Sequence, residues 1–515
     1  MNGISPKGIT AGRCGAAISP ISPRAFSAKP GTARTLGAAL IVLALFSPAS
    51  RGGTVEEAIA EVEKIAGETG LKTALVGFCL IPLDADQGAA AGYRMDTGLV
   101  PASTMKVIST ATANELLGPD YRFVTELQIT GEVDEGGTLS GDIVIRGGGD
   151  PTLGAASATE PFDGWKAALV KAGVKKVEGS VIGDASIFGT ALTPDTWQWN
   201  DMGNYYGAAA SGLTIYQNLF YCSFRTPSVG AKAPFTGTVP KLPGIEFVNE
   251  MRVGSSGSGD KGFIYGDPYG TLFYLRGTVP AGSGSFTIKG ALPDPAFFCA
   301  RTFSEYLRGN GLPVSGEATT DRLLGVAGKE IGTRRTIHEQ SSDSLASILT
   351  VTNHKSDNLR AEAIHRLIGI AKGKKGTTTE ASEATYAHWA AKGIDMTGFF
   401  MGDGCGLSRS NTVTPRQMTM MLYHAAKSPH FDTFYASLPT AGQSGTLRSI
   451  GGGSSAEGRV RAKSGTLDRI RNYSGYVNAR SGKRYAFTLF LNNYTGDLGP
   501  VKSKIVRVWT KMVAL

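Results

Sequence analysis

The sequence predicts a mixed α/β protein in which one domain of helices and strands is interrupted by a β-rich insertion. Helical patterns concentrate towards the two ends of the chain, in residues 50–122 and 336–515, whereas short strand patterns separated by Gly, Pro and Ser dominate residues 123–335. Glycine accounts for 69 of the 515 residues, which favours turns over a helical bundle. A structureless loop of about 200 residues is implausible in a compact protein. The insertion is therefore expected to form one or two subdomains of its own, two being the expectation.

The segment before the insertion is expected to contain a helix, a strand and a second helix. Residues 54–66 carry apolar side chains at helical spacing, namely Val55, Ile59, Val62 and Ile65. Residues 73–87 have the pattern of a strand that runs into a turn. Pro101 opens a second helix, which stops where Gly118 precedes a proline.

The insertion is predicted to be mainly strands, and the segment after it returns to helices before ending in a sheet. Strands are expected in the insertion at residues 126–133, 141–147, 176–184 and 286–292. The segment after it is expected to hold helices at 343–354 and 358–373, strands at 458–466, 471–479 and 484–493, and a last helix from about Pro500. No internal repeat accompanies these patterns.

The positive charge of the chain is concentrated at its start. Residues 1–49 contain five basic side chains and no acid, whereas the rest of the chain balances 47 basic against 43 acidic residues. A body so close to neutral gives no reason to expect a nucleic-acid partner.

Residues 1–49 are interpreted as a secretory signal peptide. The apolar run Leu36–Phe46 would rise only about 16 Å as a helix, too short to span a bilayer of roughly 30 Å. Small residues then lead to Ala49, near which cleavage is expected. An organelle-type transit peptide, a misassigned start and an uncleaved anchor remain the alternatives. The interpretation predicts a periplasmic protein without a stable transmembrane segment after cleavage, in loose contact with membrane or wall at most.

Four cysteines would remain after cleavage, and the sequence leaves their state open. They are Cys79, Cys222, Cys299 and Cys405. In an oxidising compartment they could form two bridges, but free buried thiols are equally compatible with a chain of this size.

The first candidate for chemistry is a serine and a lysine three residues apart at the start of a predicted helix. Ser103 and Lys106 would share one helix face, where a lysine of lowered pKa can activate a serine. The helix start also offers free N–H groups to a developing oxyanion. The same spacing occurs at Ser258 and Lys261, but a Gly/Ser loop there provides no helix to align the side chains, so we discount that pair.

Two further short motifs follow in the chain. Ser356, Asp357 and Asn358 lie at a predicted turn between two helices, where such residues also serve as caps. Residues 463–466, Lys-Ser-Gly-Thr, end a strand, where the glycine would allow backbone to approach a ligand closely. Each motif alone fits a structural role. The three together, in this order and on these elements, indicate a serine active site.

The three motifs resemble those of the penicillin-binding protein and serine β-lactamase superfamily, S-x-x-K, S-x-N and K-[ST]-G. The closer resemblance is to the D-alanyl-D-alanine carboxypeptidase/endopeptidases of the penicillin-binding protein 4 type, peptidase family S13, which carry a long insertion between the first two motifs. Further stretches resemble the same family, namely residues 147–153, 183–188, 197–213, 403–411, 438–448 and 461–477. The resemblance implies a transpeptidase-type domain, an antiparallel sheet flanked by helices. Ser464 replaces the commoner Thr, and Cys405 stands where Ser is usual.

The resemblance implies a catalytic role for five residues. Ser103 would attack the carbonyl of the penultimate D-alanine, with Lys106 as its base. Ser356 would relay the proton between Lys106, Lys463 and the leaving amine, while Asn358 would hold the substrate amide. Water would then hydrolyse the acyl-enzyme, and neither metal nor cofactor is required. β-Lactams are expected to acylate the same serine.

Substrate binding is implied for the third motif. The hydroxyl groups of Ser464 and Thr466 would face the terminal carboxylate together with Lys463. Gly465 would allow the strand to approach the substrate, and the backbone N–H groups of Ser103 and Thr466 would form the oxyanion hole.

A side-chain pocket for the free end of meso-diaminopimelate is also implied. That group carries one ammonium and one carboxylate, so its recognition requires an acid and a base held apart. Asp201 matches the acid, Tyr206 an aromatic wall and Arg409 the partner of the carboxylate. Asp468 is a further candidate for the pocket. Alternatively, Asp201 caps a turn and Arg409 forms a surface pair. The expected partners are therefore peptidoglycan stem peptides of the diaminopimelate type.

Three functions remain open. The first is a serine D,D-peptidase that cleaves D-Ala-D-Ala and, in endopeptidase action, the D-Ala-diaminopimelate cross-link. The second, a β-lactamase or esterase on the same fold, would need a base for the deacylating water, and no loop glutamate for that role is identifiable. The third, an inactive wall-binding protein, would be expected to have lost a motif residue, and none is lost. The first function is preferred.

Overall fold

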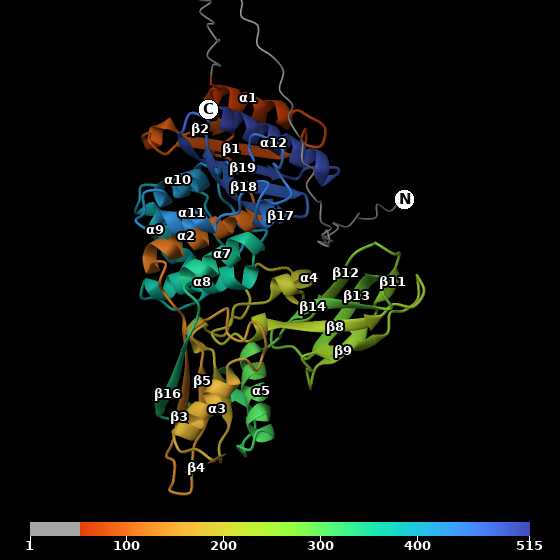
Figure 1. Ribbon diagram of the computed structural model, residues 1–515, viewed down its shortest axis with the longest axis vertical. Helices are drawn as coiled ribbons and strands as arrows, with labels where there is room; N and C mark the ends of the chain where they lie inside the picture. Colours follow the sequence, from red (N-terminus) through yellow and green to blue (C-terminus); the bar gives the residue numbers. More distant parts are fainter. Residues whose placement is uncertain (1–51) are drawn as a thin grey trace, which may run out of the picture.

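A computed structural model describes residues 52–515, and the predicted signal peptide, residues 1–49, lies outside the described residues. The part of the molecule at the top of Figure 1 is built on a five-stranded antiparallel sheet with strand order β17-β18-β19-β1-β2. Its strands come from both ends of the chain and are β1 (Leu75–Pro82), β2 (Ala91–Tyr93), β17 (Val460–Leu467), β18 (Ile470–Asn478) and β19 (Arg484–Asn492).

Helices cover both faces of this sheet. α1 (Val55–Ala66) and α12 (Leu498–Ala514) pack on one face, where Trp509 and Leu489 share an apolar cluster. The other face packs against α2 (Met105–Leu117) and α10 (Pro415–Ala425), and Phe490 belongs to that cluster. Successive strand residues point to opposite faces, so neighbouring residues of β19 enter different clusters. Cover on both faces leaves β18 and β19 buried along nearly their whole length.

Further helices adjoin α2, and two of them, α7 (Leu345–Lys355) and α8 (Asn358–Ala371), flank the second motif. The others are α9 (Thr378–Ala390) and α11 (Phe431–Ser437). α2 packs against α8 and α7, so the first and second motifs lie on adjacent helices.

The chain leaves this part along β3 (Val124–Thr130) and returns along β16 (Arg334–Ser341), and the two strands pair antiparallel. They belong to a second five-stranded sheet, of order β15-β7-β5-β3-β16, at the bottom of Figure 1. Its other strands and adjoining helices are β5 (Ile143–Arg146), β7 (Val181–Asp184), β15 (Thr319–Thr320), α3 (Phe162–Lys171), α5 (Pro295–Gly309) and α6 (Asp321–Val326). A short pair, β4 (Thr138–Leu139) and β6 (Lys176–Val177), adjoins it.

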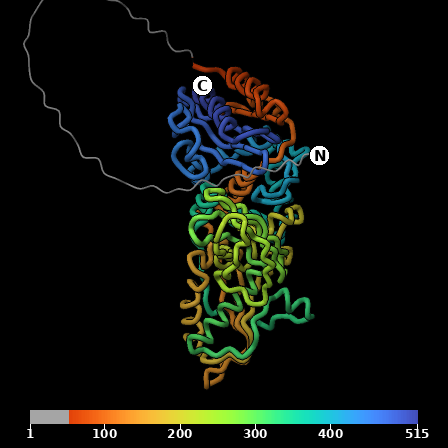
Figure 2. The backbone as a smooth tube through the Cα atoms, turned by 90° about the vertical axis from the view of Figure 1, so that its right-hand side faces the viewer, coloured from red at the N-terminus to blue at the C-terminus, as the bar shows by residue number. Residues whose placement is uncertain are grey.

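The remaining inserted strands form two smaller sheets. One has order β14-β8-β9, and the other has order β10-β13-β11 with β12 paired to β13. Their bounds are β8 (Leu219–Arg225), β9 (Phe235–Val239), β10 (Glu246–Asn249), β11 (Arg252–Gly254), β12 (Lys261–Tyr265), β13 (Leu272–Pro280) and β14 (Ser285–Ala291). One apolar cluster runs through this group and the second sheet. Figure 2 shows the inserted segments below the first sheet along the long axis. The domain boundaries and the division into two subdomains stay predictions.

The expected mixed α/β class is confirmed, and the element bounds differ mainly at their ends. The first helix begins at Val55, because the Thr54 side chain caps it by accepting a hydrogen bond from the Glu57 N–H at 3.3 Å. Residues 73–87, expected to form a strand that runs into a turn, form β1 over Leu75–Pro82 and then a turn. No helix within residues 52–515 is long and apolar enough to cross a membrane. All four cysteines of this part are buried free thiols.

Candidate active site

The predicted nucleophile lies on a short 3-10 turn before a helix. The chain forms η2 (Ala102–Thr104) and only then α2, so the α-helix does not open at Pro101 as the sequence predicted. In 3-10 geometry, side chains three residues apart eclipse each other, so Ser103 and Lys106 face the same way. Lys106 Nζ donates to Ser103 Oγ at 3.1 Å, and Ser103 remains partly exposed.

Close backbone approach holds this turn in place. Ala102, directly before the nucleophile, has a φ of 49°, a conformation that non-glycine residues seldom adopt. A Cβ at Gly406 would lie 1.9 Å from the Ala102 carbonyl oxygen, and a Cβ at Gly465 would lie 2.5 Å from the Pro101 carbonyl oxygen. Only glycine at these two positions allows a loop and strand β17 to press against the turn that carries the serine.

Lys106 is fully buried and contacts the second motif. Its Nζ donates to Asn358 Oδ1 at 2.7 Å and to the Cys405 carbonyl oxygen at 2.6 Å, in addition to Ser103. Burial lowers the pKa of Lys106, while the nearby acids Asp403 and Glu362 act in the opposite direction. A lowered pKa increases the neutral fraction that can accept a proton from serine.

The second motif lies at the turn between α7 and α8, as predicted. Ser356 ends α7 in the left-handed conformation, with a φ of 57°, and Asp357 caps α8 by accepting a hydrogen bond from the Arg360 N–H at 2.9 Å. Asn358 is the first residue of α8, and its Nδ2 donates to the Tyr206 carbonyl oxygen at 2.7 Å. The amide thus joins Lys106 to the inserted segment.

The third motif brings a second buried lysine to the site. Lys463 Nζ donates to Ser356 Oγ at 2.9 Å and to the Ser464 carbonyl oxygen at 2.7 Å. Burial, together with the positive charges of Lys106 and Arg471, lowers the pKa of Lys463 well below its usual range. Lys106 thus joins Ser103 to Asn358, and Lys463 joins Ser356 of the same turn to strand β17.

The two hydroxyl groups of the third motif differ in their surroundings. Ser464 is buried, and its Oγ donates to Thr446 Oγ1 at 2.8 Å. Thr466 is exposed, and its Oγ1 accepts a hydrogen bond from the Arg471 guanidinium. Thr466 is thus the hydroxyl more accessible to a substrate.

The structure brings three of the four pocket candidates together. Asp201 lies in α4 (Trp199–Met202), and Tyr206 lies in η4 (Tyr205–Gly207). Arg409 Nη1 contacts Asp201 Oδ2 at 3.3 Å, so the acid and the base are in contact rather than held apart as the sequence analysis expected. The contact has a physical reason, because Asp201 is only 5% exposed and a buried carboxylate requires a compensating charge.

The surroundings of Asp201 act on its pKa in opposite directions. Burial raises the pKa of Asp201, while Arg409 and a hydrogen bond from Tyr206 oppose the rise.

Asp468, the fourth candidate, is exposed in the turn between β17 and β18 and takes part in no ion pair within the described chain. The structure therefore does not join Asp468 to the other three by a direct contact.

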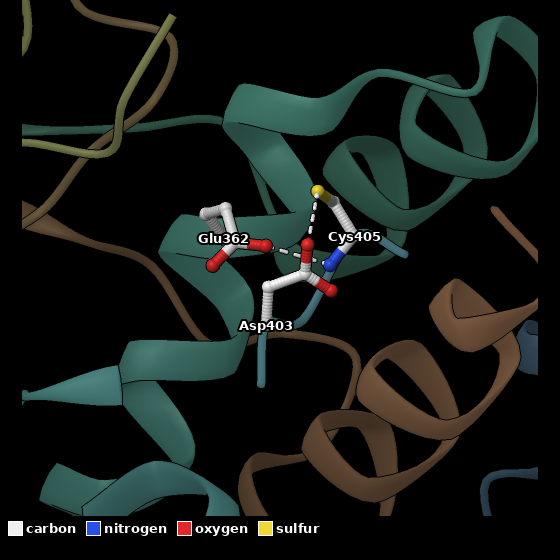
Figure 3. Close-up of side chains that lie close together, drawn as sticks. All are labelled: Glu362, Asp403 and Cys405. Carbon is white, nitrogen blue, oxygen red and sulfur yellow. Dashed lines mark hydrogen bonds between the residues drawn. The ribbon is translucent and has the colours of Figure 1, made fainter. Parts of the chain in front are cut away.

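A buried group behind Lys106 was not predicted from the sequence. Figure 3 shows Glu362, Asp403 and Cys405 facing one another, with the Glu362 carboxylate accepting the Cys405 N–H at 2.6 Å. Burial, reinforced by the charge of Asp403, raises the pKa of Glu362 to about 7. Because the Cys405 carbonyl accepts a hydrogen bond from Lys106, Glu362 is linked to Lys106 through the backbone of this one residue.

The ligand atoms of these three residues lie within 4.8 Å of one another, a spacing that a metal ion could use. The bonding of Asp403 does not fit that role, because its oxygens already accept four N–H groups. The donors are Trp197 Nε1, Gly406 N, Ser408 N and Asn411 Nδ2, at 2.6–2.8 Å. Burial also raises the pKa of the Cys405 thiol well above its usual range, which opposes the thiolate form that binds metals. The group fits a hydrogen-bonded support of the loop behind Lys106.

Two features of the sequence could have pointed to these unpredicted residues. Glu362 follows Asn358 by four residues on one helix, the spacing at which side chains share a face. Asp403 and Thr446 belong to stretches already noted for their resemblance to the family, residues 403–411 and 438–448.

Comparisons with known proteins agree with this geometry. A family model described as the D-Ala-D-Ala carboxypeptidase 3 (S13) family matches residues 58–512. A D-alanyl-D-alanine carboxypeptidase of Actinomadura sp. (strain R39) is 30% identical over 500 residues, which cover 93% of this chain and 90% of the relative. The D-alanyl-D-alanine carboxypeptidase DacB of Haemophilus influenzae is 26% identical over 439 residues, which cover 82% and 86%.

Solved structures show the same fold. The crystal structure of penicillin binding protein 4 from Haemophilus influenzae matches with a TM-score of 0.73 at 23% identity, covering 89% of this chain and 98% of the other. The same protein complexed with a β-lactam matches with a TM-score of 0.70 at 22% identity, covering 87% and 98%. The predicted fold class is confirmed.

The fold, and a site in which Ser103 and Lys106 are in contact at the start of a helix, fit the penicillin-binding class of serine enzymes. The chain belongs to the D-Ala-D-Ala carboxypeptidase 3 (S13) family. It is a serine-type D-alanyl-D-alanine carboxypeptidase, as the sequence predicted.

Proposed function

We propose that Ser103 is the nucleophile that cleaves the D-Ala-D-Ala bond of peptidoglycan stem peptides through an acyl-enzyme. The observation that carries this proposal is the Lys106 Nζ contact with Ser103 Oγ at 3.1 Å, made by a buried lysine of lowered pKa. Neutral Lys106 takes the proton as Ser103 Oγ bonds to the penultimate carbonyl carbon. The backbone N–H groups of Ser103 and Thr466 stabilise the oxyanion.

The second and third motifs return the proton to the leaving amine. Ser356 Oγ lies 2.9 Å from Lys463 Nζ, and Ser356 shares its turn with Asn358, the partner of Lys106, so in this proposal it relays the proton to the nitrogen of the departing D-alanine. Asn358 positions the substrate amide, and Ser464, Gly465 and Thr466 line the strand beside the terminal carboxylate. Water then hydrolyses the ester and releases Ser103. The carbon–nitrogen bond breaks in the first half, and the carbon–oxygen bond of the ester breaks in the second.

We further propose that the substrate side chain is meso-diaminopimelate, held by Asp201, Tyr206 and Arg409, with Asp468 at the edge of that pocket. The support is the contact of Asp201 with Arg409 and the hydrogen bond that links Tyr206 to Asn358. The ammonium of diaminopimelate would replace Arg409 as the partner of Asp201, and the carboxylate of the same group would bind Arg409. Cleavage of the D-Ala-diaminopimelate cross-link is proposed as a second reaction of the same site.

The proposed location is the periplasm, after removal of residues 1–49 as a signal peptide. The support is the leader with five basic and no acidic residues followed by an apolar run. We also propose a discontinuous catalytic domain, residues 50–122 and 336–515, around an inserted region of residues 123–335.

Steady-state kinetics with a D-Ala-D-Ala peptide beside a penicillin test the function. A D,D-peptidase releases D-alanine repeatedly but retains the penicilloyl ester for long periods. Rapid turnover of penicillin without peptide hydrolysis would instead indicate a β-lactamase. Failure of both reactions in a folded protein would indicate a binding protein without catalysis.

A further inference from the structure

Arg471 is a buried cation at the start of strand β18. It pairs across the ladder with Thr466 of β17, and it is 8% exposed. Residues paired in this way point to the same face of a sheet, and the Arg471 guanidinium donates from Nη1 to the Thr466 hydroxyl. Its Nε donates to the Tyr473 hydroxyl at 2.6 Å, and the guanidinium lies 4.9 Å from the centre of the Tyr473 ring. These contacts fix the guanidinium beside an exposed hydroxyl.

No carboxylate compensates this charge. Within residues 52–515, Arg471 takes part in no ion pair, and its neighbours include the further cations Lys463 and Lys502, whose pKa values burial and Arg471 lower. Burial raises the pKa of Tyr473, so that hydroxyl stays neutral and supplies no counter-charge. A guanidinium has five N–H donors, of which the protein's hydrogen bonds use two. A buried cation with spare donors favours an anionic ligand.

Lys463 is poorly suited to be the main cation that binds such an anionic ligand. Its Nζ already donates to Ser356 Oγ and to the Ser464 carbonyl oxygen, and its pKa is lowered well below the usual range. An arginine stays protonated at every physiological pH and can bind both oxygens of a carboxylate at once. Of Lys463 and Arg471, Arg471 is therefore the cation that remains charged and in contact with Thr466.

We propose that Arg471 binds the carboxylate on the carbon attached to the scissile nitrogen and thereby selects substrates that carry it. The inference rests on the proposed function, since Thr466 is the hydroxyl expected to face that group. In D-Ala-D-Ala this carboxylate is the free chain end. In a D-Ala-diaminopimelate cross-link, the carbon next to the cleaved nitrogen carries a carboxylate too. Arg471 would thus make one site serve both bonds and reject an ordinary internal peptide bond.

The test compares two peptides that differ only in this group, one ending in D-Ala-D-Ala and the other in the corresponding carboxamide. The wild-type protein is expected to prefer the acid in kcat/KM. Arg471→Gln should lower kcat/KM for the acid by about 10-fold to 150-fold, the range for a hydrogen bond to a charged group, and leave the amide within about threefold. The acid-to-amide ratio is the readout, because a packing defect lowers both rates together.

Arg469→Gln is the matched control. Arg469 lies two residues earlier, in the turn that leads into β18, is exposed, and donates to the carbonyl oxygens of Asn493 and Tyr494. The Arg469→Gln substitution removes the same charge from the same hairpin, yet it should leave the acid-to-amide ratio unchanged. Arg471→Lys retains a charge without the paired donors and should lower the ratio by about tenfold. That variant supplies the test if Arg471→Gln does not fold.

The outcomes separate this inference from the proposed function. Equal losses on acid and amide in an Arg471 variant, or an unchanged ratio, would overturn the carboxylate role and leave Arg471 as a support for Thr466 and Tyr473. A wild-type protein that neither hydrolyses the acid peptide nor is acylated by penicillin would instead refute the proposed function.

Discussion

At the proposed nucleophile, the decisive feature is the protonation state of Lys106. Its Nζ approaches three oxygen acceptors, and it can act as a base only when neutral. Lys106→Arg keeps the positive charge but cannot deprotonate, so acylation should slow by about 10²-fold to 10⁴-fold, the usual contribution of a general base. Stopped-flow or mass-spectrometric acylation rates check this expectation. Lys64→Arg on the exposed side of α1 is the control and should react normally. Near-normal acylation of Lys106→Arg would remove the lysine from the mechanism.

The charged pair of Asp201 and Arg409 is proposed to select the side chain of the substrate. Asp201→Ala and Arg409→Ala should each cost about 1.5–3 kcal/mol in kcat/KM on diaminopimelate peptides, because each removes a hydrogen bond to a charged group. Penicillin lacks that side chain, so its acylation rate should be largely unchanged in both variants. Kinetics on peptides with and without the diaminopimelyl end measure the difference. Equal losses on both peptides would show that the pair only supports the local fold.

The positions of the three motifs at a helix start, a turn and a strand were predictable because local patterns encode these elements. Ser103 and Lys106 needed only a helix start, and Asn358 needed only the turn between two helices. The direct contact of Asp201 with Arg409 was not predictable, since it joins an inserted segment to a loop 208 positions away in the sequence. Such a distance depends on how the inserted sheets lie against the helices, which no local pattern specifies.

Among the elements, α8 connects the second motif to the buried group behind Lys106. It carries Asn358 in its first turn and Glu362 one turn later. Glu362 has a pKa of about 7, raised from 4.5 mainly by burial. At a pH between these two values, Glu362 is therefore protonated in the folded state and ionised in the unfolded state. Its contribution to stability is therefore greatest at low pH and is lost as the pH rises through 7.

Glu362→Gln should remove this pH dependence. Between pH 5 and pH 8, the wild-type free energy of unfolding should fall by about 2–3 kcal/mol more than that of the variant, from the two pKa values of Glu362. Urea denaturation at several pH values measures the two slopes, and the comparison of slopes cancels any constant packing cost. Glu63→Gln, an exposed position of α1, is the control and should retain the wild-type slope. Parallel slopes for Glu362→Gln and wild type would contradict the assignment.

Element bounds followed from the sequence where local chemistry decides them and shifted where tertiary contact decides them. The first helix starts at its threonine cap, which a local pattern encodes. The turn at Ser103 is 3-10 rather than α because strand β17 and the Gly406 loop press against it from outside. That pressure comes from residues more than 300 positions away, so a helix opening at Pro101 was the natural expectation.

For the whole molecule, the reactivity of the four cysteine thiols measures how well the folded structure buries them. Burial raises the pKa of Cys79 to about 12, and it also raises the pKa values of Cys222, Cys299 and Cys405. A protein beginning at residue 52 should therefore react negligibly with a thiol reagent at pH 8 in the native state and expose four thiols on unfolding without reductant. A colorimetric thiol titration checks the number. Fewer than four thiols in the unfolded protein would indicate a disulfide.

The insertion shows the limit of sequence reasoning at the largest scale. Its β-rich character follows from composition and turn residues, but its strand order does not. The pairing of β3 with β16 closes a loop of about 200 residues, and two parallel pairings attach β11 and β10 to β13. Partners so distant, and so short, are selected by the packing of one shared apolar cluster.

The central claim is that Ser103 is the nucleophile of this fold, and the most direct test is intact-protein mass spectrometry after incubation with penicillin, followed by peptide mapping. One penicilloyl group should add to the wild-type protein and map to the peptide that contains Ser103. Ser103→Ala should fold with the same thermal midpoint, gain no adduct and release no D-alanine. An adduct at Ser258, or continued labelling of Ser103→Ala, would contradict the assignment of the active site.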